Sequence, residues 1–326
     1  WSHHAGPGWG LHNEYWAWLD AQGAHFETPP RDDCPYVLEG MPPDRHQTTW
    51  CAEKACDFMT EHAGDEAPWL FSVNLFDPHH AFDPPAEYLA PYLARLDAIP
   101  LPNYVEGELA GKPPFQQEDH EGAYGGFAGF AFEAMSERDH RMVRAAYWAM
   151  CDLIDDQVGR MLDTLEATGQ LENTLLIYTS DHGEMLGEHG IYLKGPFFYE
   201  PAVRVPLIIA GPGSVAAQTS EALVELTDLP QTVLDAVGLP HHPGMQGKSL
   251  WPLFTGETDA DHHRDDVYAE YYNAMPWHYN PTAQMTMVRT DTHKLVMDHA
   301  HNTGELYDLD EDPTETHNRW GDPDYA

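Results

Sequence analysis

The chain has 326 residues, with 54 acidic against 16 basic side chains and a formal net charge of −38. Such a field repels nucleic acid and anionic membrane surfaces, so we expect neither as a partner. A hydrophobic content of 42% is too high for a disordered chain, and no apolar run approaches the roughly 18 residues of a membrane-spanning helix. Nothing near Trp1 resembles a signal peptide, so a periplasmic or secreted location and a cytoplasmic one both stay open.

Two helices and one strand are predicted in the first third of the chain. The helices cover residues 14–22 and 47–62, and the apolar run at residues 69–76 is typical of a strand. That run ends in Asp77-Pro78-His79-His80. Residues 100–135 are rich in Pro and Gly and indicate a long surface loop, a kind of segment that often serves as a lid or binding loop.

The strongest helix pattern runs from Glu137 to Thr168. Ser136 and Asp139 resemble a capping pair at its start, and Gly169 supplies a stop. Apolar residues recur at three- and four-residue steps and form one face. These residues are Val143, Ala146, Met150, Ile154, Val158, Met161 and Leu165.

Apolar segments at residues 174–180 and 204–210 follow this helix and are typical of buried strands. Strand, long helix and strand in this order predict βαβ units. We therefore expect an α/β fold over residues 1–256, with a mostly parallel sheet flanked by helices. Residues 257–326 change character and predict a small C-terminal antiparallel α+β subdomain. Its expected strands are residues 267–272, 285–289, 294–297 and 305–309.

Asp181 and His182 stand directly after the predicted strand, in the run Thr179-Ser180-Asp181-His182-Gly183-Glu184. Ligands of open α/β sheets bind at the carboxyl ends of the strands. A carboxylate there is a ligand for Ca²⁺, Mg²⁺ or Mn²⁺, and an adjacent imidazole widens the choice toward Mn²⁺ or Zn²⁺. The alternative is a capped turn in which Asp181 accepts hydrogen bonds from the backbone. Further along, Glu184, Glu188 and His189 could also be ligands, but they are expected to anchor the loop or to face solvent.

Lys194 lies twelve residues beyond His182, and it is one of only five lysines in the chain. A lysine beside a metal could bind a substrate oxyanion or donate a proton to a leaving group. The alternative is a solvated surface lysine, and the position before a Gly-Pro turn, between two predicted strands, keeps the functional role open beside it.

His79 and His80 follow the predicted strand at residues 69–76 and precede Ala81-Phe82-Asp83-Pro84-Pro85. A histidine at a sheet end could act as a general acid or base. The chain holds 21 histidines, so the residue type alone does not predict a role in catalysis. The hypothesis of an acid or base role rests on the position of this pair at the end of the predicted strand.

The sequence resembles the sulfatases of the alkaline phosphatase superfamily over nearly its whole length. The segments that carry the resemblance appear in the order of the family. They are residues 71–85, residues 179–190 followed by Lys194, residues 199–208, Asp228-Leu229-Pro230-Gln231-Thr232, Gly247-Lys248-Ser249-Leu250 and Glu305-Leu306-Tyr307-Asp308-Leu309.

The resemblance implies a role for each matching residue. Asp181 and His182 match the second pair of metal ligands, and the metal is expected to be Ca²⁺, with Mn²⁺ or Mg²⁺ as alternatives. Lys194 matches the lysine that contacts the sulfate and assists the leaving group. His79 matches the histidine that contacts the substrate and donates a proton to the departing alkoxide, and His80 is the second choice.

The family's nucleophile is absent from this sequence. Sulfatases use a formylglycine made from the first residue of a C/S-x-P/A-x-R motif, and no Cys or Ser here begins such a motif. The paired aspartates that complete the metal site are also not visible. We therefore expect these parts to lie upstream of this chain, which would then be a truncated sulfatase with little or no turnover by itself.

The expected substrate is a small-molecule or carbohydrate sulfate ester, and the oligomeric state stays open. Two alternatives remain. One is a phosphonate monoester or phosphodiester hydrolase of the same superfamily, and the other is a non-catalytic metal- or carbohydrate-binding relative. The aromatic segment at residues 275–279 either shapes the leaving-group pocket or packs between subdomains.

Overall fold

The structure, a computed structural model, describes residues 13–215, 217–274, 278 and 280–325. The chain folds into two compact units. The first takes in residues up to 101 together with residues 135–174, and the second takes in residues 102–134 and 175–326. The predicted division at residue 256 stays a prediction. Among the described residues, no helix has both the length and the apolar character that crossing a membrane requires.

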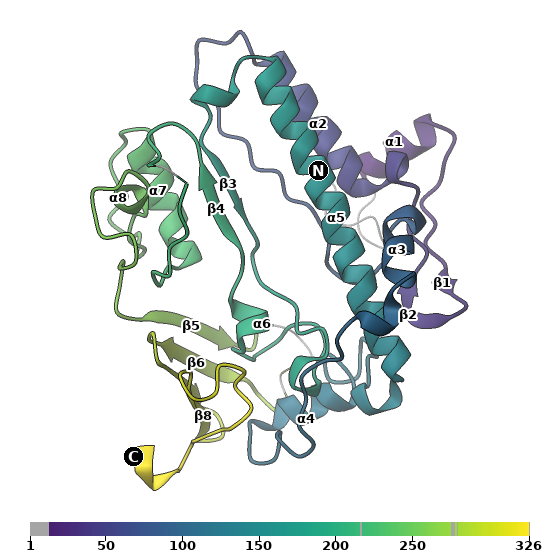
Figure 1. Cartoon of the computed structure of the whole chain (residues 1–326), viewed down its shortest axis with the longest axis vertical. Helices are drawn as coiled ribbons and strands as arrows, with labels where there is room; N and C mark the ends of the chain where they lie inside the picture. Colours follow the sequence, from purple (N-terminus) through teal and green to yellow (C-terminus); the bar gives the residue numbers. More distant parts are fainter. Residues whose placement is uncertain (1–12, 216, 275–277, 279, 326) are drawn as a thin grey trace. The chain divides into compact units, whose positions relative to one another are not determined.

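The first unit is organised around α5, Glu137–Ala167, which runs beside α2, Gln47–Glu61 (Figure 1). The capping box predicted at Ser136 and Asp139 is present, since each residue's side chain accepts a hydrogen bond from the other's backbone N–H. Gly169 follows with a φ of +70°. The remaining elements of the unit are α1 (Glu14–Ala21), β1 (Pro30–Arg31), β2 (Cys34–Leu38) and α3 (Ala86–Leu93).

The predicted apolar face of α5 is confirmed at its centre. Val143, Ala146 and Met150 are fully buried, and Leu165 is buried near the end of the helix. A second cluster forms where α1 meets the start of α2, with Tyr15, Leu19 and Trp50 at its centre and Ala24 and Met41 around them. Apolar periodicity therefore located the helical core of this unit correctly.

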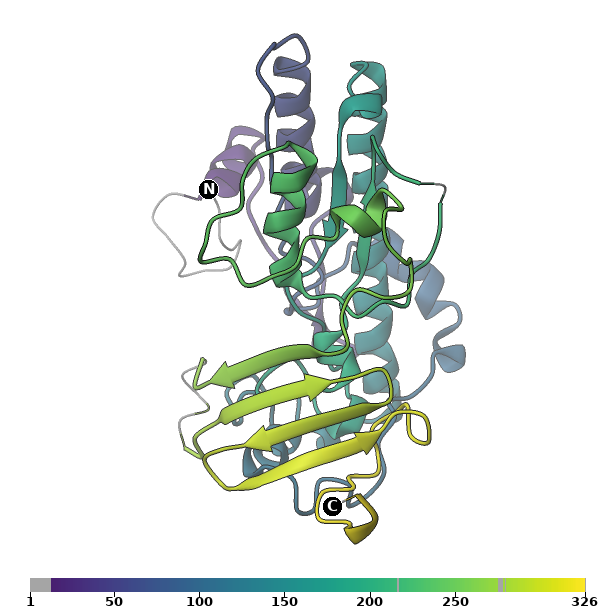
Figure 2. The same cartoon turned by 90° about the vertical axis from the view of Figure 1, so that its left-hand side faces the viewer.

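The second unit carries α4 (Pro114–Glu121), β3 (Leu176–Thr179), α6 (Glu200–Val203), β4 (Leu207–Ala210), α7 (Leu229–Ala236) and α8 (Trp251–Phe254). Four further strands follow: β5 (Val267–Tyr272), β6 (Gln284–Arg289), β7 (His293–Asp298) and β8 (Thr303–Asp308). They form one antiparallel sheet in sequence order (Figure 2). Mixed α/β structure with a C-terminal antiparallel sheet is the predicted class, which the structure confirms.

Strand pairing differs from the prediction in two places. β3 pairs with β4 antiparallel, in register from Leu176 opposite Ala210 to Thr179 opposite Leu207, whereas the strand–helix–strand order favoured parallel neighbours. Residues 69–76 form no strand in the described part of the chain, and Leu70 is 81% exposed. A β pattern requires a hydrogen-bonding partner, and local sequence does not specify which segment supplies it.

β3 is half-buried, although its apolar sequence indicated a buried strand. Tyr178 is 40% exposed and Ile208, opposite it on β4, is 61% exposed. Within the described residues these two strands form a sheet of their own. A two-stranded sheet leaves more of its side chains accessible than a central strand does, because nothing in the ladder flanks its outer edges.

One face of the C-terminal sheet packs on the core of the second unit. Met285, Met287, Val296 and Tyr307 alternate with outward-facing residues along β6, β7 and β8 and are at most 4% exposed. They join a cluster that includes Tyr199, in the segment just before α6. Alternation of this kind is what an antiparallel sheet with one solvated face requires. The sheet therefore supports the segment that follows Lys194.

Candidate active site

Asp181 and His182 lie just beyond the end of β3. The Asp181 side chain is 86% exposed and that of His182 is 39% exposed, with His182 Nε2 at 3.6 Å from Asp181 Oδ2. His182 Nδ1 lies 2.8 Å from the Gly183 carbonyl oxygen. A carbonyl oxygen only accepts, so Nδ1 carries the proton and Nε2 presents its lone pair on the side of Asp181. The pair therefore offers two ligand atoms with the imidazole already in the metal-binding tautomer.

Gly183 is required by a close approach of two backbone segments. A Cβ built at this position would lie 1.9 Å from the carbonyl oxygen of Pro201 in α6. The approach is fixed by a hydrogen bond from Gly183 N to the Ala202 carbonyl oxygen, at 2.8 Å. Only a residue without a side chain allows this contact. The glycine after the Asp–His pair thus anchors the loop to α6.

The Glu184 side chain turns inward and organises the rest of the loop. Its carboxylate accepts hydrogen bonds from the backbone N–H groups of Leu193, at 2.6 Å, and Leu186, at 3.2 Å. The loop also closes on itself through Met185 N and the Leu193 carbonyl oxygen, at 2.9 Å. Of the two roles predicted for Glu184, the geometry is that of a loop anchor. This anchor brings Leu193, the residue before Lys194, back to the Asp–His motif.

Three non-glycine residues of this loop have left-handed backbone conformations. Leu186, His189 and Leu193 have φ values of +47°, +56° and +66°. Such conformations are uncommon for residues with a Cβ, and they persist only where the surroundings hold them. The hydrogen bonds of Glu184 and the stacking of His189 on Tyr199, with ring centroids 3.8 Å apart, supply that support. Strain held in this way is typical of functional sites.

Lys194 is partly buried and electrostatically linked to this motif. Burial lowers the pKa of Lys194 to about 8, against the opposing attraction of the Glu184 and Asp181 carboxylates. Burial likewise raises the pKa of Glu184 to about 7, although the N–H groups it binds and the charge of Lys194 oppose the change. The Lys194 ammonium also lies over the Tyr124 ring, 5.5 Å from its centroid. A solvated surface lysine would show none of these features.

Residues 102–134 enclose the motif loop. The Asn103 backbone N–H donates to the Glu188 carboxylate at 2.8 Å, and the Asn103 carbonyl oxygen accepts from His189 N at the same distance. His120 of α4 contacts the Gly190 carbonyl oxygen at 2.8 Å, and its side chain is buried. The segment predicted as a surface loop therefore contains a helix with buried residues, because the motif loop supplies it with a surface to pack on.

His79 and His80 belong to the first unit. Both are half-buried, and their rings stack with centroids 4.1 Å apart. His79 Nδ1 donates to the His80 carbonyl oxygen, which leaves the lone pair of His79 on Nε2. The Phe76 ring packs against the His79 ring at 4.6 Å between centroids. These contacts with His80 and Phe76 fix the orientation of the His79 ring, as proton transfer to a substrate requires.

The structure thus brings Asp181, His182 and Lys194 together in the second unit, whereas His79 lies in the first. Two contributors were missed as partners of the lysine, Glu184 and Tyr124. The sequence showed that Glu184 belongs to the motif, but it did not show that this side chain is partly removed from solvent. Tyr124 lies in a different segment, and nothing in its local sequence pointed to Lys194. Of the aromatic segment at residues 275–279, only His278 is within the described residues, and it is buried and paired with Asp119 at 3.1 Å.

Comparison with known proteins places this geometry in a family. The Sulfatase family pattern matches residues 12–239, and a pattern described as N-sulphoglucosamine sulphohydrolase, C-terminal, matches residues 187–326. An N-acetylglucosamine-6-O-sulfatase of Bacteroides thetaiotaomicron is 38% identical over 191 residues, which are 55% of this chain and 32% of that protein.

Solved structures agree with these matches. A phosphonate monoester hydrolase from Silicibacter pomeroyi superposes with a TM-score of 0.82 at 26% identity, covering 97% of this chain and 66% of that one. A protein solved in complex with its substrate D-glucosamine-2-N,6-O-disulfate gives a TM-score of 0.72 at 25% identity, with 86% and 66% covered. The chain spans about a third of the curated relative's length and about two thirds of each solved structure. The chain belongs to the sulfatase family of the alkaline phosphatase superfamily.

Proposed function

We propose that this chain carries the Asp181, His182, Lys194 and His79 part of the active site of a sulfate ester hydrolase. One observation carries the proposal: a metal-competent Asp–His pair is linked to a partly buried lysine through one anchored loop. The half-buried Glu184 fixes both ends of that loop. A carboxylate, a lone-pair nitrogen and a nearby cation are what a site for an anionic ester needs.

Asp181 and His182 would hold a divalent cation. The 3.6 Å between Asp181 Oδ2 and His182 Nε2 suits two ligands of one ion, and the exposure of Asp181 leaves room for further ligands and for substrate. A bound cation would neutralise sulfate oxygens and lower the pKa of the nucleophile. We propose Ca²⁺ on the family resemblance, with Mn²⁺ as the alternative that an imidazole ligand favours.

Lys194 would bind the sulfate and assist the leaving group. With a pKa lowered to about 8, its ammonium is still protonated at neutral pH and gives up its proton more readily than an ordinary lysine. His79 would take a proton on Nε2 and deliver it to the departing alkoxide, since its Nδ1 is committed to the His80 carbonyl. The nucleophile would be the formylglycine of the family, which no Cys or Ser of this chain matches.

The metal site can be tested on the chain itself. Titration of the chain with Ca²⁺ and with Mn²⁺, followed by calorimetry, should show a binding event that the Asp181→Asn and His182→Ala variants lose. The matched control is the exposed pair His62 and Asp65, whose Nδ1 and Oδ2 atoms are 2.6 Å apart. If Asp65→Asn reduced binding as much as Asp181→Asn, the ion would be held by surface charge and the proposed site would be wrong.

The substrate class is proposed from the similar proteins. One bears the name of a sulfatase of N-acetylglucosamine, and another was solved with a disulfated glucosamine. We therefore propose a carbohydrate sulfate ester as substrate. The protein extended upstream to include a C/S-x-P/A-x-R motif should release sulfate from sulfated glucosamine, and a Cys or Ser to Ala change in that motif should abolish release.

A phosphonate monoester hydrolase is the second candidate, because the solved structure with a TM-score of 0.82 has that activity in its name. The Asp–His pair does not separate the two. Parallel assays of the extended protein with an aryl sulfate and an aryl phosphonate monoester decide between them. Faster phosphonate turnover would make this second candidate the correct one.

A further inference from the structure

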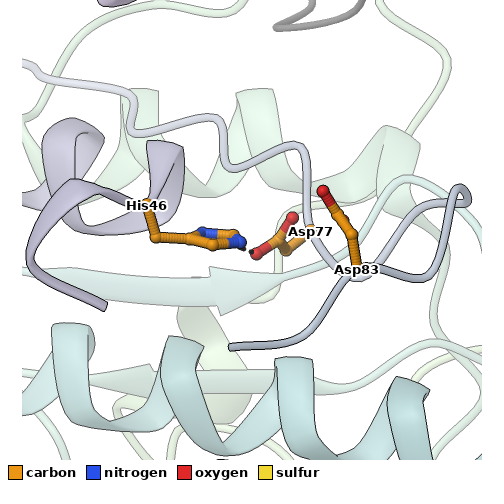
Figure 3. A group of neighbouring side chains, drawn as sticks. All are labelled: His46, Asp77 and Asp83. Atoms are coloured by element: carbon orange, nitrogen blue, oxygen red, sulfur yellow. Dashed lines mark ion pairs between the residues drawn. The ribbon is translucent and has the colours of Figure 1, made fainter. Parts of the chain in front are cut away.

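Three side chains with metal-binding atoms meet in the first unit, away from the Asp181–His182 motif in the sequence. His46 is the N-cap residue of α2, and Asp77 and Asp83 stand at the two ends of the loop that carries His79. One ligand atom from each lies within 4.8 Å of the others. Figure 3 shows the imidazole directed at Asp77, with Asp83 beside it. Long-range folding, and not sequence spacing, brings this His and these two carboxylates together.

The cluster holds more negative charge than its visible partners balance. His46 is 3% exposed and Asp77 is 6% exposed. Among the described residues, no lysine or arginine forms an ion pair with Asp77 or Asp83. Burial and the neighbouring Asp77 carboxylate raise the pKa of Asp83 well above its usual range. Two facing carboxylates in a buried place require a bound cation or a shared proton.

The hydrogen bonds of His46 favour a cation. The backbone N–H of Thr48 donates to His46 Nδ1 at 3.3 Å, so this nitrogen carries a lone pair and not a proton. The same nitrogen lies 3.4 Å from Asp77 Oδ2. Nδ1 therefore presents electron density and no proton toward this carboxylate, and a cation near both atoms would stabilise the arrangement. Metal–nitrogen and metal–oxygen bonds of about 2.0–2.1 Å at a tetrahedral angle place the two ligand atoms about 3.3 Å apart.

We propose that His46, Asp77 and Asp83 bind a divalent transition-metal ion of the zinc class. One imidazole and two carboxylates are three protein ligands of the kind that zinc accepts, and a fourth position remains for water. Ca²⁺ fits poorly because it takes six to eight oxygen ligands. The Thr48 hydroxyl donates to Asp77 Oδ2 at 2.6 Å and serves as the outer hydrogen bond that orients a ligating carboxylate.

Metal binding would replace one hydrogen bond at the start of α2 with a metal–nitrogen bond. The cap bond from Thr48 N to His46 Nδ1 is long at 3.3 Å, and a metal on Nδ1 replaces it. Asp83 is half-buried on an irregular segment and is the ligand that adjusts. Because Asp77 and Asp83 bracket residues 78–82, the ion would fix both ends of the loop that carries His79. The site is therefore structural, and its ligands are different residues from the Asp181 and His182 pair proposed for catalysis.

The two metal sites can be separated by removing the catalytic one. In a chain with Asp181→Asn and His182→Ala, incubation with ZnCl₂ and desalting should leave one equivalent of zinc, measured by mass spectrometry. Adding Asp83→Asn to this background should remove that equivalent and abolish the rise in melting temperature caused by ZnCl₂. Adding His46→Asn should do the same, since Asn retains the ability to cap α2.

The matched control is Asp65→Asn in the same background, which should keep the full equivalent, because Asp65 pairs with His62 on the surface. A shared proton predicts the opposite pattern. In that case no zinc is retained before Asp83 is changed, and Asp83→Asn raises the melting temperature in metal-free buffer because it removes a like charge. Either of these results overturns the proposal. Circular dichroism of each variant confirms that the chain is folded.

Discussion

Lys194 and Lys294 lie in the same compact unit, yet their burial and their surroundings differ. Lys294 is fully buried and donates to the Phe198 carbonyl oxygen at 2.9 Å and to Glu200 at 2.7 Å, with Glu315 at 2.5 Å. Lys194 is only partly buried, lies over an aromatic ring and has a pKa lowered to about 8. The first lysine holds the sheet to α6, and the second is the one that we propose binds a ligand.

One residue type can thus stabilise the fold at one position and, as we propose, bind a ligand at another position of the same unit. A buried lysine with carboxylate partners is fixed, because moving it leaves unpaired charges behind. Lys194 is instead coupled to Glu184, a carboxyl group whose pKa burial raises, and we propose that sulfate binds at this lysine and not at Lys294. The four predictions below separate the two roles.

The largest effect is expected at Lys294. Replacing it with Met leaves Glu200 and Glu315 without their shared cation, and we expect the free energy of unfolding to fall by about 3–5 kcal/mol. Urea unfolding followed by fluorescence measures this change. The control is Lys54→Met, at a surface lysine paired with Asp57, for which a loss below about 1 kcal/mol is expected. Equal losses for the two variants would contradict the structural role.

Gly183→Ala tests whether the loop around Lys194 depends on its close approach to α6. The added methyl group meets the Pro201 carbonyl oxygen, so we expect a loss of about 1–3 kcal/mol in unfolding free energy. Gly159→Ala, within α5 and with nothing inside 4 Å of a new Cβ, should instead stabilise the chain by up to about 1 kcal/mol. A loss of unfolding free energy in Gly183→Ala together with a gain in Gly159→Ala is the result that supports the close approach.

Lys194→Met should separate binding from stability. Removing the charge relieves a desolvation cost that outweighs its attraction to Glu184, because the net pKa shift of Lys194 is downward, so the unfolding free energy at neutral pH should stay the same or rise. Affinity of the metal-loaded chain for sulfate should fall by roughly tenfold or more, which corresponds to about 1.4 kcal/mol. Calorimetric titration with sodium sulfate measures the affinity. A large loss of stability with unchanged sulfate binding would make Lys194 a structural residue like Lys294.

The last effect is a pH dependence of stability that the removal of Lys194 should abolish. Its pKa is about 8 in the folded chain and 10.5 as the ordinary value. Below pH 8 Lys194 is protonated in both the folded and the unfolded chain, so the full cost of burying its charge lowers the stability of the fold. Between the two values the unfolded chain binds more protons, so folding stability rises with pH. Wild type should therefore gain stability relative to Lys194→Met from pH 8 to pH 10, and parallel profiles would show that the lysine is not desolvated.

Local patterns in the sequence determined much of this fold. The capping pair, the apolar face and the stop at Gly169 located α5 to within a residue at its end. Alternation and turns located all four C-terminal strands. These features rest on interactions between residues close in sequence, and such interactions act the same way in any surroundings. The pairing of strands that are distant in sequence depends on the rest of the fold. This pairing makes β3 antiparallel to β4, and it leaves residues 69–76 outside any ladder in the described part of the chain.

The candidate site divides in the same way. The order of the motifs predicted Asp181, His182, Lys194 and His79 as site residues. This prediction needs only residue types and their spacing, because these determine both the ligand chemistry and the family resemblance. The packing of distant segments, by contrast, partly buries Glu184, places Tyr124 at Lys194 and brings His46 to Asp77 and Asp83. Burial and charge proximity depend on which distant segments pack together. The sequence therefore determined which groups are present, and the fold decided which of them lose water and act on one another.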